Sequence, residues 1–299
     1  MNAKQRMLYV YNPRSGRGVI RDRLNEILNL FTAAGYDVVV HPTQSRGDAV
    51  KTVKRLADLV DIVVCSGGDG TMDEVLRAVM DIDPGKTIGY IPTGSTNDFA
   101  NSIGIPKNPI QAAKDILNGE IYCCDVGEFN RRYFVYVAAF GAFTKISYET
   151  DQTMKNIFGH LAYLSQAGTQ VFNLPKYHLT GEIDGQRIDG DYTYGMITNA
   201  RYVGGIKNIT GPAVDLNDGL FEVTLVHSPS NPIDISEILS SLLIRNVTSP
   251  LVEVLKGSHI VIRSEEKIDW TVDGEFGGSY KRVVINNRQR KMRIILNRS

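Results

Sequence analysis

The sequence predicts two domains, an α/β domain with a mostly parallel sheet followed by an all-β sandwich. The chain of 299 residues is longer than the roughly 150 residues of an average domain. Its first 125 residues alternate short apolar runs with amphipathic ones, as βα units do. Further along, short β-like runs separated by Asp-Gly pairs at 184, 218 and 273 indicate antiparallel hairpins.

Four βα units follow one another in the first part of the chain. Strands are expected at residues 7–11, 37–42, 61–67 and 87–92. Apolar residues at three- and four-residue spacing predict helices after the first three strands, and a fourth helix is expected to begin near Asn97. In the second part, helices are expected at 153–172 and 231–246 among the β-like runs.

Composition excludes some partners and compartments. Lys plus Arg and Asp plus Glu both total 33, so the net charge of zero argues against nucleic acid as a partner. Three cysteines without paired spacing favour a reducing cytoplasm over a disulfide framework. The N-terminus lacks a signal-peptide pattern, and the apolar run at 133–143 is shorter than the roughly 20 residues that span a bilayer.

Three strand ends carry turn residues suited to an anion. They read "YNPRSGRG" at 11–18, "SGGDGT" at 66–71 and "PTGSTND" at 92–98. Ligands of open parallel sheets bind at the carboxyl ends of the strands. Glycines there let backbone N–H groups converge on an anion, and the following helix N-terminus adds about half a positive charge. The three loops together are expected to hold a polyphosphate.

Asp69, inside the second loop, is unusual for such a cradle. Neither the Walker pattern nor the dinucleotide-binding G-x-G-x-x-G pattern matches the glycines of this chain. A carboxylate beside phosphate oxygens is repelled unless a divalent cation lies between them, so Asp69 predicts Mg²⁺ and a kinase-like site. The alternative is a tight turn in which Asp69 caps its own helix through the N–H of Met72 or Asp73.

These motifs, in this order and spacing, resemble the catalytic domain of bacterial diacylglycerol kinases and related lipid kinases, the group that includes sphingosine and ceramide kinases. "ITNARYVGGIKNITGPAVDLNDGLFEV" at 197–223 and "WTVDGE" at 270–275 resemble the second-domain signatures of that family. The resemblance implies an NAD-kinase or phosphofructokinase-like domain at 1–128 and a β-sandwich substrate domain at 129–288. It also implies an active site in the interdomain cleft and a terminal strand at 289–299 that returns to the first domain.

The resemblance assigns roles by motif. It implies ATP contacts from the strand-end loops and their neighbours, namely Asn12, Pro13, Arg14, Ser15, Gly16, Thr43, Gly67, Gly68, Asp69, Gly70, Thr71, Met72, Asp73, Glu74, Ser95, Asn97 and Asp98. Glu275 matches the general base of the family, with Asp69 and Asp273 beside it as catalytic residues. Asp125 is expected to join Asp69 and Asp98 in a magnesium and water network. Asp215, Asp218 and the carbonyl of Leu220 match a second, structural magnesium site.

Two departures and several alternatives remain open at this point. Position 73 is Asp where many members have Asn, and Ile206 replaces a usual glycine. Asp273 and Gly274 also suit a simple hairpin, and Asp215 and Asp218 suit a turn before a strand. Diacylglycerol is the default acceptor, with other lipids, NAD or another small molecule as alternatives. A nucleotide-binding regulatory protein without catalysis is the rival of another class.

The expected reaction is ATP-dependent phosphorylation of a lipid hydroxyl. A lipid acceptor implies peripheral contact of a cytoplasmic protein with the membrane. A homodimer is the default oligomeric state.

Overall fold

The computed structural model describes residues 5–142, 174–207, 214–243 and 249–298. Residue contacts divide the chain into two units, Met1–Val126 with Gln289–Ser299, and Gly127–Arg288. The helix expected at 153–172 lies outside the described residues.

The first unit is built on a parallel sheet, as the sequence predicts. Its strands are β1 (Arg6–Tyr11), β2 (Asp37–Pro42), β3 (Ile62–Gly67) and β4 (Thr87–Pro92). They lie in the order β4-β3-β1-β2, and all three pairings between them are parallel. The end of the long strand β15 (Glu275–Leu296) adds a further parallel pairing, with Arg293 opposite Thr87 on β4.

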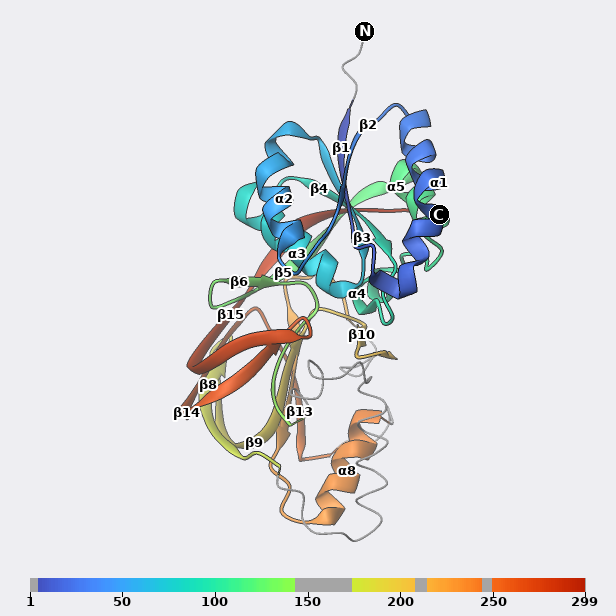
Figure 1. The fold of residues 1–299 in the computed structure, drawn as a ribbon. Coiled ribbons are helices and arrows are strands. Elements are labelled where there is room, and N and C mark those ends of the chain that lie inside the picture. Colours follow the sequence, from blue (N-terminus) through green and yellow to red (C-terminus); the bar gives the residue numbers. More distant parts are fainter. Residues whose placement is uncertain (1–4, 143–173, 208–213, 244–248, 299) are drawn as a thin grey trace. The chain divides into compact units, whose positions relative to one another are not determined.

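Helices cover both faces of this sheet, with α2 and α3 on one face and α1 and α5 on the other (Figure 1). The helical segments are η1 (Ser15–Gly18), α1 (Val19–Ala33), α2 (Asp48–Leu56), η2 (Ala57–Leu59), α3 (Asp69–Ile82), α4 (Asp98–Ile103) and α5 (Pro109–Asn118). The start of α5 is set locally. Asn108 accepts the N–H groups of Ile110 and Gln111, and Pro109 occupies the first helical position, where no N–H is needed.

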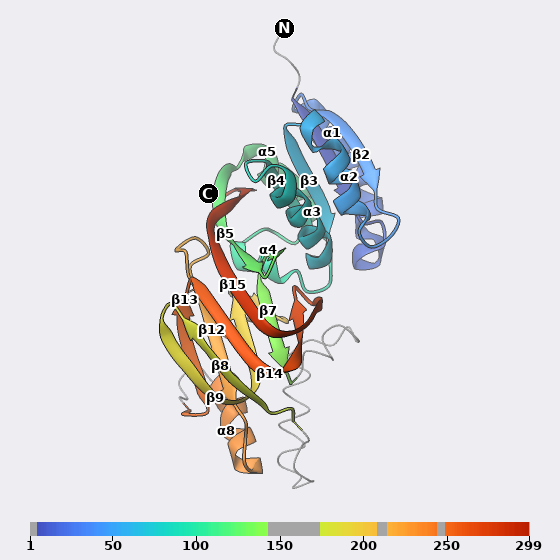
Figure 2. The same ribbon diagram turned by 90° about the vertical axis from the view of Figure 1, so that its left-hand side faces the viewer.

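The second unit is an antiparallel β structure. Its strands include β6 (Arg132–Phe134), β7 (Val137–Gly141), β8 (Tyr177–Ile183), β9 (Gln186–Thr198), β12 (Phe221–His227), β13 (Val252–Gly257) and β14 (His259–Val272). The order β13-β12-β9-β7-β14-β15 is closed on one side by β8, which pairs with both β9 and β14. Figure 2 shows β14 beside β7 and β15.

The remaining elements are β5 (Glu120–Phe129), the short pair β10 (Tyr202–Val203) and β11 (Ile206–Lys207), and the helix α8 (Pro232–Leu243). The helix expected at 231–246 is therefore present over its described part. No helix within the described residues is long and apolar enough to cross a bilayer.

Aromatic residues form the core of the second unit. Trp270 is buried, with its ring centroid 5.1 Å from Phe129 and 4.8 Å from Phe140. These contacts join β5, β7 and β14, and alternate residues of the neighbouring strands extend the same cluster. Trp270 thus ties this core to β14 shortly before the β14–β15 turn, which carries the candidate residues of this unit.

Two of the three Asp-Gly pairs form hairpin turns. Asp184-Gly185 joins β8 to β9, and Asp273-Gly274 joins β14 to β15. All four residues have positive φ angles, as the tightest hairpin turns require. The pair at Asp218 differs from the prediction, because it leads into β12 and no strand is assigned to the described residues 214–220 before it.

Candidate active site

The loops after β1, β3 and β4 are bound to one another by backbone hydrogen bonds. The N–H of Asn12 donates to the carbonyl of Ser66 at 2.8 Å. The N–H of Thr93 donates to the carbonyl of Gly67 at 2.8 Å. Three loops that are far apart in sequence thus form a single edge, as expected where parallel strands end together.

Glycines are required where these loops touch. Gly16 has a φ of +56°, and a Cβ placed on it would lie 2.0 Å from the carbonyl oxygen of Thr93. A Cβ on Gly94 would lie 2.6 Å from the Cα of Gly68. Any side chain at either position would force the loops apart. Gly16, Gly68 and Gly94 therefore allow the close approach of backbone to backbone where the loops meet.

Asp69 uses its carboxylate to hold the third loop. Its two oxygens accept the N–H groups of Asp98 at 3.0 Å and Phe99 at 3.2 Å, the first residues of α4. The N–H of Met72, the partner expected of a local cap, donates to the carbonyl of Gly68 instead. Asp69 therefore caps a helix 29 residues away rather than its own.

Polar side chains keep the first and third loops in shape. Asn12 accepts the N–H of Arg14 at 2.9 Å. Asn97, with a φ of +50°, accepts the N–H of Gly94 at 2.8 Å and donates to its carbonyl at 2.7 Å. Both asparagines therefore stabilise the backbone of the loops in which they lie.

This edge collects negative charge and retains polar groups that a ligand could use. Burial raises the pKa of the Tyr90 hydroxyl well above its usual value, and the negative charges of Asp69 and Asp98 add to the effect. The hydroxyl of Thr93 is buried and has no hydrogen-bond partner within the described residues. Two carboxylates and an unpaired hydroxyl fit a Mg²⁺ ion that takes its remaining ligands from phosphate and water.

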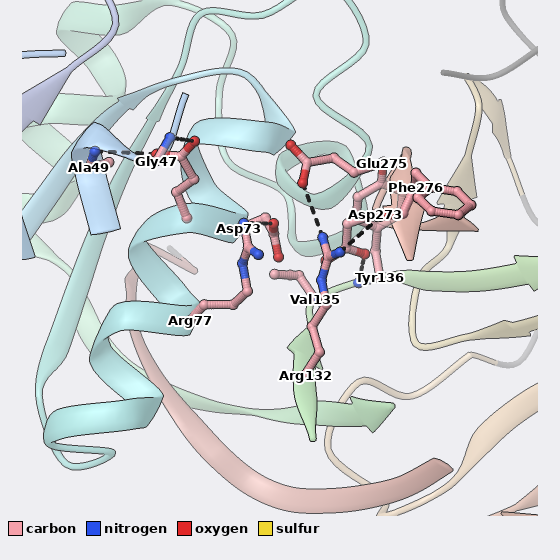
Figure 3. Close-up of polar contacts among 11 residues, drawn as sticks. Gly47, Ala49, Asp73, Arg77, Arg132, Val135, Tyr136, Asp273, Glu275 and Phe276 are labelled. Atoms are coloured by element: carbon pink, nitrogen blue, oxygen red, sulfur yellow. Dashed lines mark hydrogen bonds and ion pairs between the residues drawn. The ribbon is translucent and has the colours of Figure 1, made fainter. Parts of the chain in front are cut away.

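Other residues expected at the nucleotide act through the backbone. Glu74 is buried and accepts the N–H of Gly47 at 2.6 Å and of Ala49 at 3.2 Å, so it caps the start of α2 (Figure 3). Thr43 lies in the loop before that helix, where its N–H donates to the carbonyl of Tyr11 at 2.9 Å. The carboxylate of Glu74 thereby fixes the end of the loop that carries Thr43.

Asp73, the departure from the family pattern, is fully buried. Its carboxylate pairs with the guanidinium of Arg77 one turn further along α3, at 2.8 Å (Figure 3). The extra negative charge is therefore neutralised within the same helix. A sequence pattern could have found this pair, because Asp and Arg stand at i and i+4.

Asp125, on β5, is also fully buried. One of its oxygens accepts the N–H of Arg290, which has a φ of +54°, at 2.8 Å. Within the described residues no group of three or more His, Cys, Asp or Glu side chains lies close enough together to hold a metal ion by itself. The magnesium network expected of Asp69, Asp98 and Asp125 thus stays a prediction.

The second unit presents Glu275 directly after the Asp273-Gly274 turn. Asp273 is buried, and its carboxylate accepts the N–H groups of three consecutive residues, Val135 at 2.6 Å and Tyr136 and Val137 at 3.0 Å each. Glu275 pairs with Arg132, a residue that sequence reasoning missed, at 3.1 Å. No pattern around Arg132 indicated this pair, because 143 residues separate the partners.

A lysine lies beside the expected second metal site. The Lys256 ammonium is 3.7 Å from Asp218 and 3.2 Å from Glu222, a buried carboxylate on β12. Burial raises the pKa of Glu222 to about 7, against the lowering effect of Lys256. Asp215 and Asp218 otherwise accept backbone N–H groups of their own turn, including that of Leu220. Since the Lys256 ammonium already offsets the charge of Asp218, that carboxylate does not need a divalent cation. The second magnesium site expected of Asp215, Asp218 and the carbonyl of Leu220 stays a prediction.

Comparison with known proteins gives the same picture over the whole chain. Residues 6–129 match the family model of the diacylglycerol kinase catalytic domain, and residues 137–292 match that of the YegS C-terminal NAD kinase beta sandwich-like domain. The diacylglycerol kinase of Bacillus subtilis is 31% identical over 92% of this chain and 91% of its own length. The diacylglycerol kinase of Staphylococcus carnosus is 30% identical, covering 96% and 94% of the two chains.

Two solved structures from Bacillus anthracis share the architecture. One is a crystal structure of a diacylglycerol kinase, which matches with a TM-score of 0.77 at 24% identity and covers 100% of this chain and 98% of that one. Another crystal structure from that organism matches with a TM-score of 0.83 at 26% identity over 100% and 97% of the two chains. The fold class predicted from the sequence, an α/β domain followed by a β-sandwich, is confirmed.

Proposed function

The chain belongs to the diacylglycerol kinase family, and on this premise we propose that it transfers the γ-phosphate of ATP to the hydroxyl of diacylglycerol, yielding phosphatidic acid. The chain is an ATP-dependent lipid kinase. Diacylglycerol as the acceptor is inferred from the names of its relatives. Magnesium, the roles of single residues and contact with the membrane are further parts of the proposal.

The observation that carries this proposal is the glycine-lined edge of the first unit. Backbone of the three loops meets there at positions where no Cβ fits, next to the half-buried carboxylate of Asp69 and the hydroxyl of Thr93, which has no hydrogen-bond partner among the described residues. A phosphate chain needs converging N–H groups, and the edge is built from backbone. We assign the nucleotide to this edge, with Asn12–Gly16, Gly67–Thr71 and Ser95–Asp98 as its surroundings.

Phosphoryl transfer asks little covalent chemistry of the protein, whose tasks are alignment and charge neutralisation. We assign Mg²⁺ to Asp69 and Asp98; when bound, it offsets the charge of the phosphate oxygens. Asp69 also caps α4, so its carboxylate holds the third loop in position for the nucleotide. Glu275 is assigned to take the proton of the acceptor hydroxyl. Asp273 holds the turn that presents Glu275.

The partners follow from the acceptor. A lipid hydroxyl is met at a membrane surface, so we propose peripheral contact with the membrane from the cytoplasm. Sedimentation with vesicles that contain diacylglycerol tests this contact. A homodimer stays a prediction, which sedimentation velocity of the purified protein tests.

The acceptor is tested by incubating the purified protein with γ-labelled ATP and a total lipid extract. We expect labelled phosphatidic acid, identified by mass spectrometry. Label in a different lipid would replace the acceptor but keep the reaction class. Label in NAD, with none in lipids, would overturn the proposal in favour of the alternative that shares "GGDGT".

The role of Asp69 is tested by Asp69→Asn, with Asp81→Asn on the exposed side of α3 as the matched control. We expect lipid phosphorylation to fall at least about a hundredfold in the first variant only, because the metal-binding charge is lost while most of the side-chain shape remains. Thermal shift by ATP with Mg²⁺, compared with ATP and EDTA, reads metal binding directly. A magnesium-dependent shift that survives in Asp69→Asn would contradict the assignment.

A further inference from the structure

Hydrogen bonds on both sides of Asp273 hold the turn before Glu275 to the rest of the second unit. Asp273 lies in the left-handed region, with a φ of +49°, and the residue is 3% exposed. The carboxylate accepts three consecutive N–H groups, of residues 135–137, and the N–H of Asp273 donates back to the carbonyl of Val137 at 2.8 Å. Four hydrogen bonds therefore join this turn to the chain that leads into β7, and they fix where Glu275 leaves the turn.

Arg132 lies only three residues before that segment, on β6, and its guanidinium contacts the two residues that follow the turn, Glu275 and Phe276. One guanidinium nitrogen, Nη2, is 3.1 Å from Oε2 of Glu275. The other, Nη1, donates to the carbonyl of Phe276 at 3.2 Å. Figure 3 shows the guanidinium directed at the Glu275 carboxylate. A planar guanidinium makes two such bonds in a fixed relation, which a lysine ammonium does not.

The contact between Arg132 and Glu275 is not needed to form the turn. The four bonds of Asp273 already fix the backbone, and an ion pair with partly exposed side chains, here 23% and 18%, adds little stability. What the contact does determine is the side-chain direction of Glu275. Because the same guanidinium is anchored on the carbonyl of Phe276, the carboxylate cannot rotate away without breaking its bond to an anchored partner.

We propose that Arg132 is a positioning residue for phosphoryl transfer, acting through Glu275 by holding its carboxylate in the direction from which it accepts the proton. This inference rests on the proposed role of Glu275. The alternative is that Arg132 binds a phosphate group of the nucleotide itself. In that case its loss should raise the KM for ATP, whereas a positioning residue affects kcat.

The test measures kcat and the KM for ATP in lipid phosphorylation, with diacylglycerol in mixed micelles, for Arg132→Gln and Arg132→Lys. Arg131→Gln, at the exposed neighbouring arginine, is the matched control. We expect kcat of Arg132→Gln to fall about tenfold to a hundredfold, since small misplacements of a catalytic group are costly. The KM for ATP is expected to stay within about twofold, and Arg132→Lys to recover part of the loss.

A double-mutant cycle with Glu275→Gln decides between positioning and an independent role. If Arg132 acts only through Glu275, Arg132→Gln added to Glu275→Gln changes the residual turnover less than about twofold. A further tenfold loss in the double variant, a large rise in the KM for ATP, or full kcat in Arg132→Gln would each overturn the proposal. Thermal unfolding checks that the variants fold, and Arg132→Lys carries the test if Arg132→Gln does not.

The same experiment separates this inference from the proposed function. Near-normal turnover of Glu275→Gln alone would show that Glu275 is not the base, whatever Arg132 does. Loss of activity in Glu275→Gln together with full activity in Arg132→Gln would remove only the role of Arg132.

Discussion

Two hairpin turns of the second unit begin with the same residues but serve different ends. We call Asp184-Gly185 the outer turn and Asp273-Gly274 the base turn. Their φ angles agree closely, at 46° and 86° in the outer turn and 49° and 78° in the base turn. In each, the aspartate carboxylate accepts backbone N–H groups of a neighbouring segment, and its own N–H donates to a carbonyl there.

The difference between them lies in burial and in the next residue. Asp184 is exposed, and the residue after the outer turn is Gln186. Asp273 is buried, and the residue after the base turn is Glu275, which pairs with Arg132. The same two-residue signal therefore yields either a plain hairpin or a rigid support for a carboxylate. Tertiary partners, which are more than 130 residues away in the base turn, decide which of the two results.

The largest difference in stability is expected between Asp273→Ala and Asp184→Ala. Loss of the buried carboxylate leaves three N–H groups without acceptors, so Asp273→Ala should lower the free energy of unfolding by roughly 3 kcal/mol or more. At the exposed outer turn, water replaces the lost acceptor, and a loss of about 1 kcal/mol is expected. Urea denaturation of both variants measures the gap, and equal losses would break the comparison.

At the third Asp-Gly pair, which contains Asp218, we expect an intermediate effect on the free energy of unfolding. Lys256→Met removes the ammonium between Asp218 and the buried Glu222, so the free energy of unfolding should fall by about 1–2 kcal/mol at neutral pH. Without ATP, whose phosphates complete the site assigned to Asp69 and Asp98, the melting temperature of the wild type should be the same with Mg²⁺ as with EDTA, because Lys256 already supplies the positive charge beside Asp218. A melting temperature of the wild type that rises with Mg²⁺, and loses that rise in Asp218→Asn, would instead establish the second metal site.

The smallest effect is a pH dependence at the outer turn. Burial alone would raise the pKa of Asp184, but hydrogen bonds from Ser258 and His259 outweigh it and hold that pKa below its usual value. The ionised Asp184 carboxylate therefore stabilises the fold when the pH is above the ordinary pKa of aspartate. This contribution is lost as the pH falls through the lowered pKa of the folded state. The wild type should lose slightly more stability than Asp184→Asn between about pH 5 and pH 3. The check is to measure the free energy of unfolding of both proteins at a series of acid pH values. An equal loss of stability in the wild type and in Asp184→Asn would contradict this prediction.

The parallel sheet and its glycine loops could be predicted from the sequence because they depend on local patterns. The four strands of the first unit lie where the apolar runs indicate, and the glycines meet where the loops were expected to meet. In the second unit the period-two pattern identified strands but not their lengths. The apolar runs around Ile262 and Trp270, each no longer than an ordinary strand, both belong to the single strand β14, whose pairing with β15 shifts register across residues 264–267.

Long-range partners of polar side chains could not be predicted. Glu74 belongs to a nucleotide motif, yet its carboxylate caps α2, and Asp69 caps α4 rather than its own helix. In both cases the acceptor and the N–H groups are about 25–30 residues apart, and no local rule links them. Arg132 shows the same limit more strongly, since only the fold brings it to Glu275.

The account depends most on Glu275, because the base turn matters to function only if this carboxylate takes part in the reaction. The direct test compares lipid phosphorylation by Glu275→Gln with that by Gln186→Ala, the matched change after the outer turn. We expect kcat to fall at least about a hundredfold in Glu275→Gln, with ATP binding and melting temperature unchanged, and wild-type turnover in Gln186→Ala. Near-wild-type turnover of Glu275→Gln would contradict the central claim.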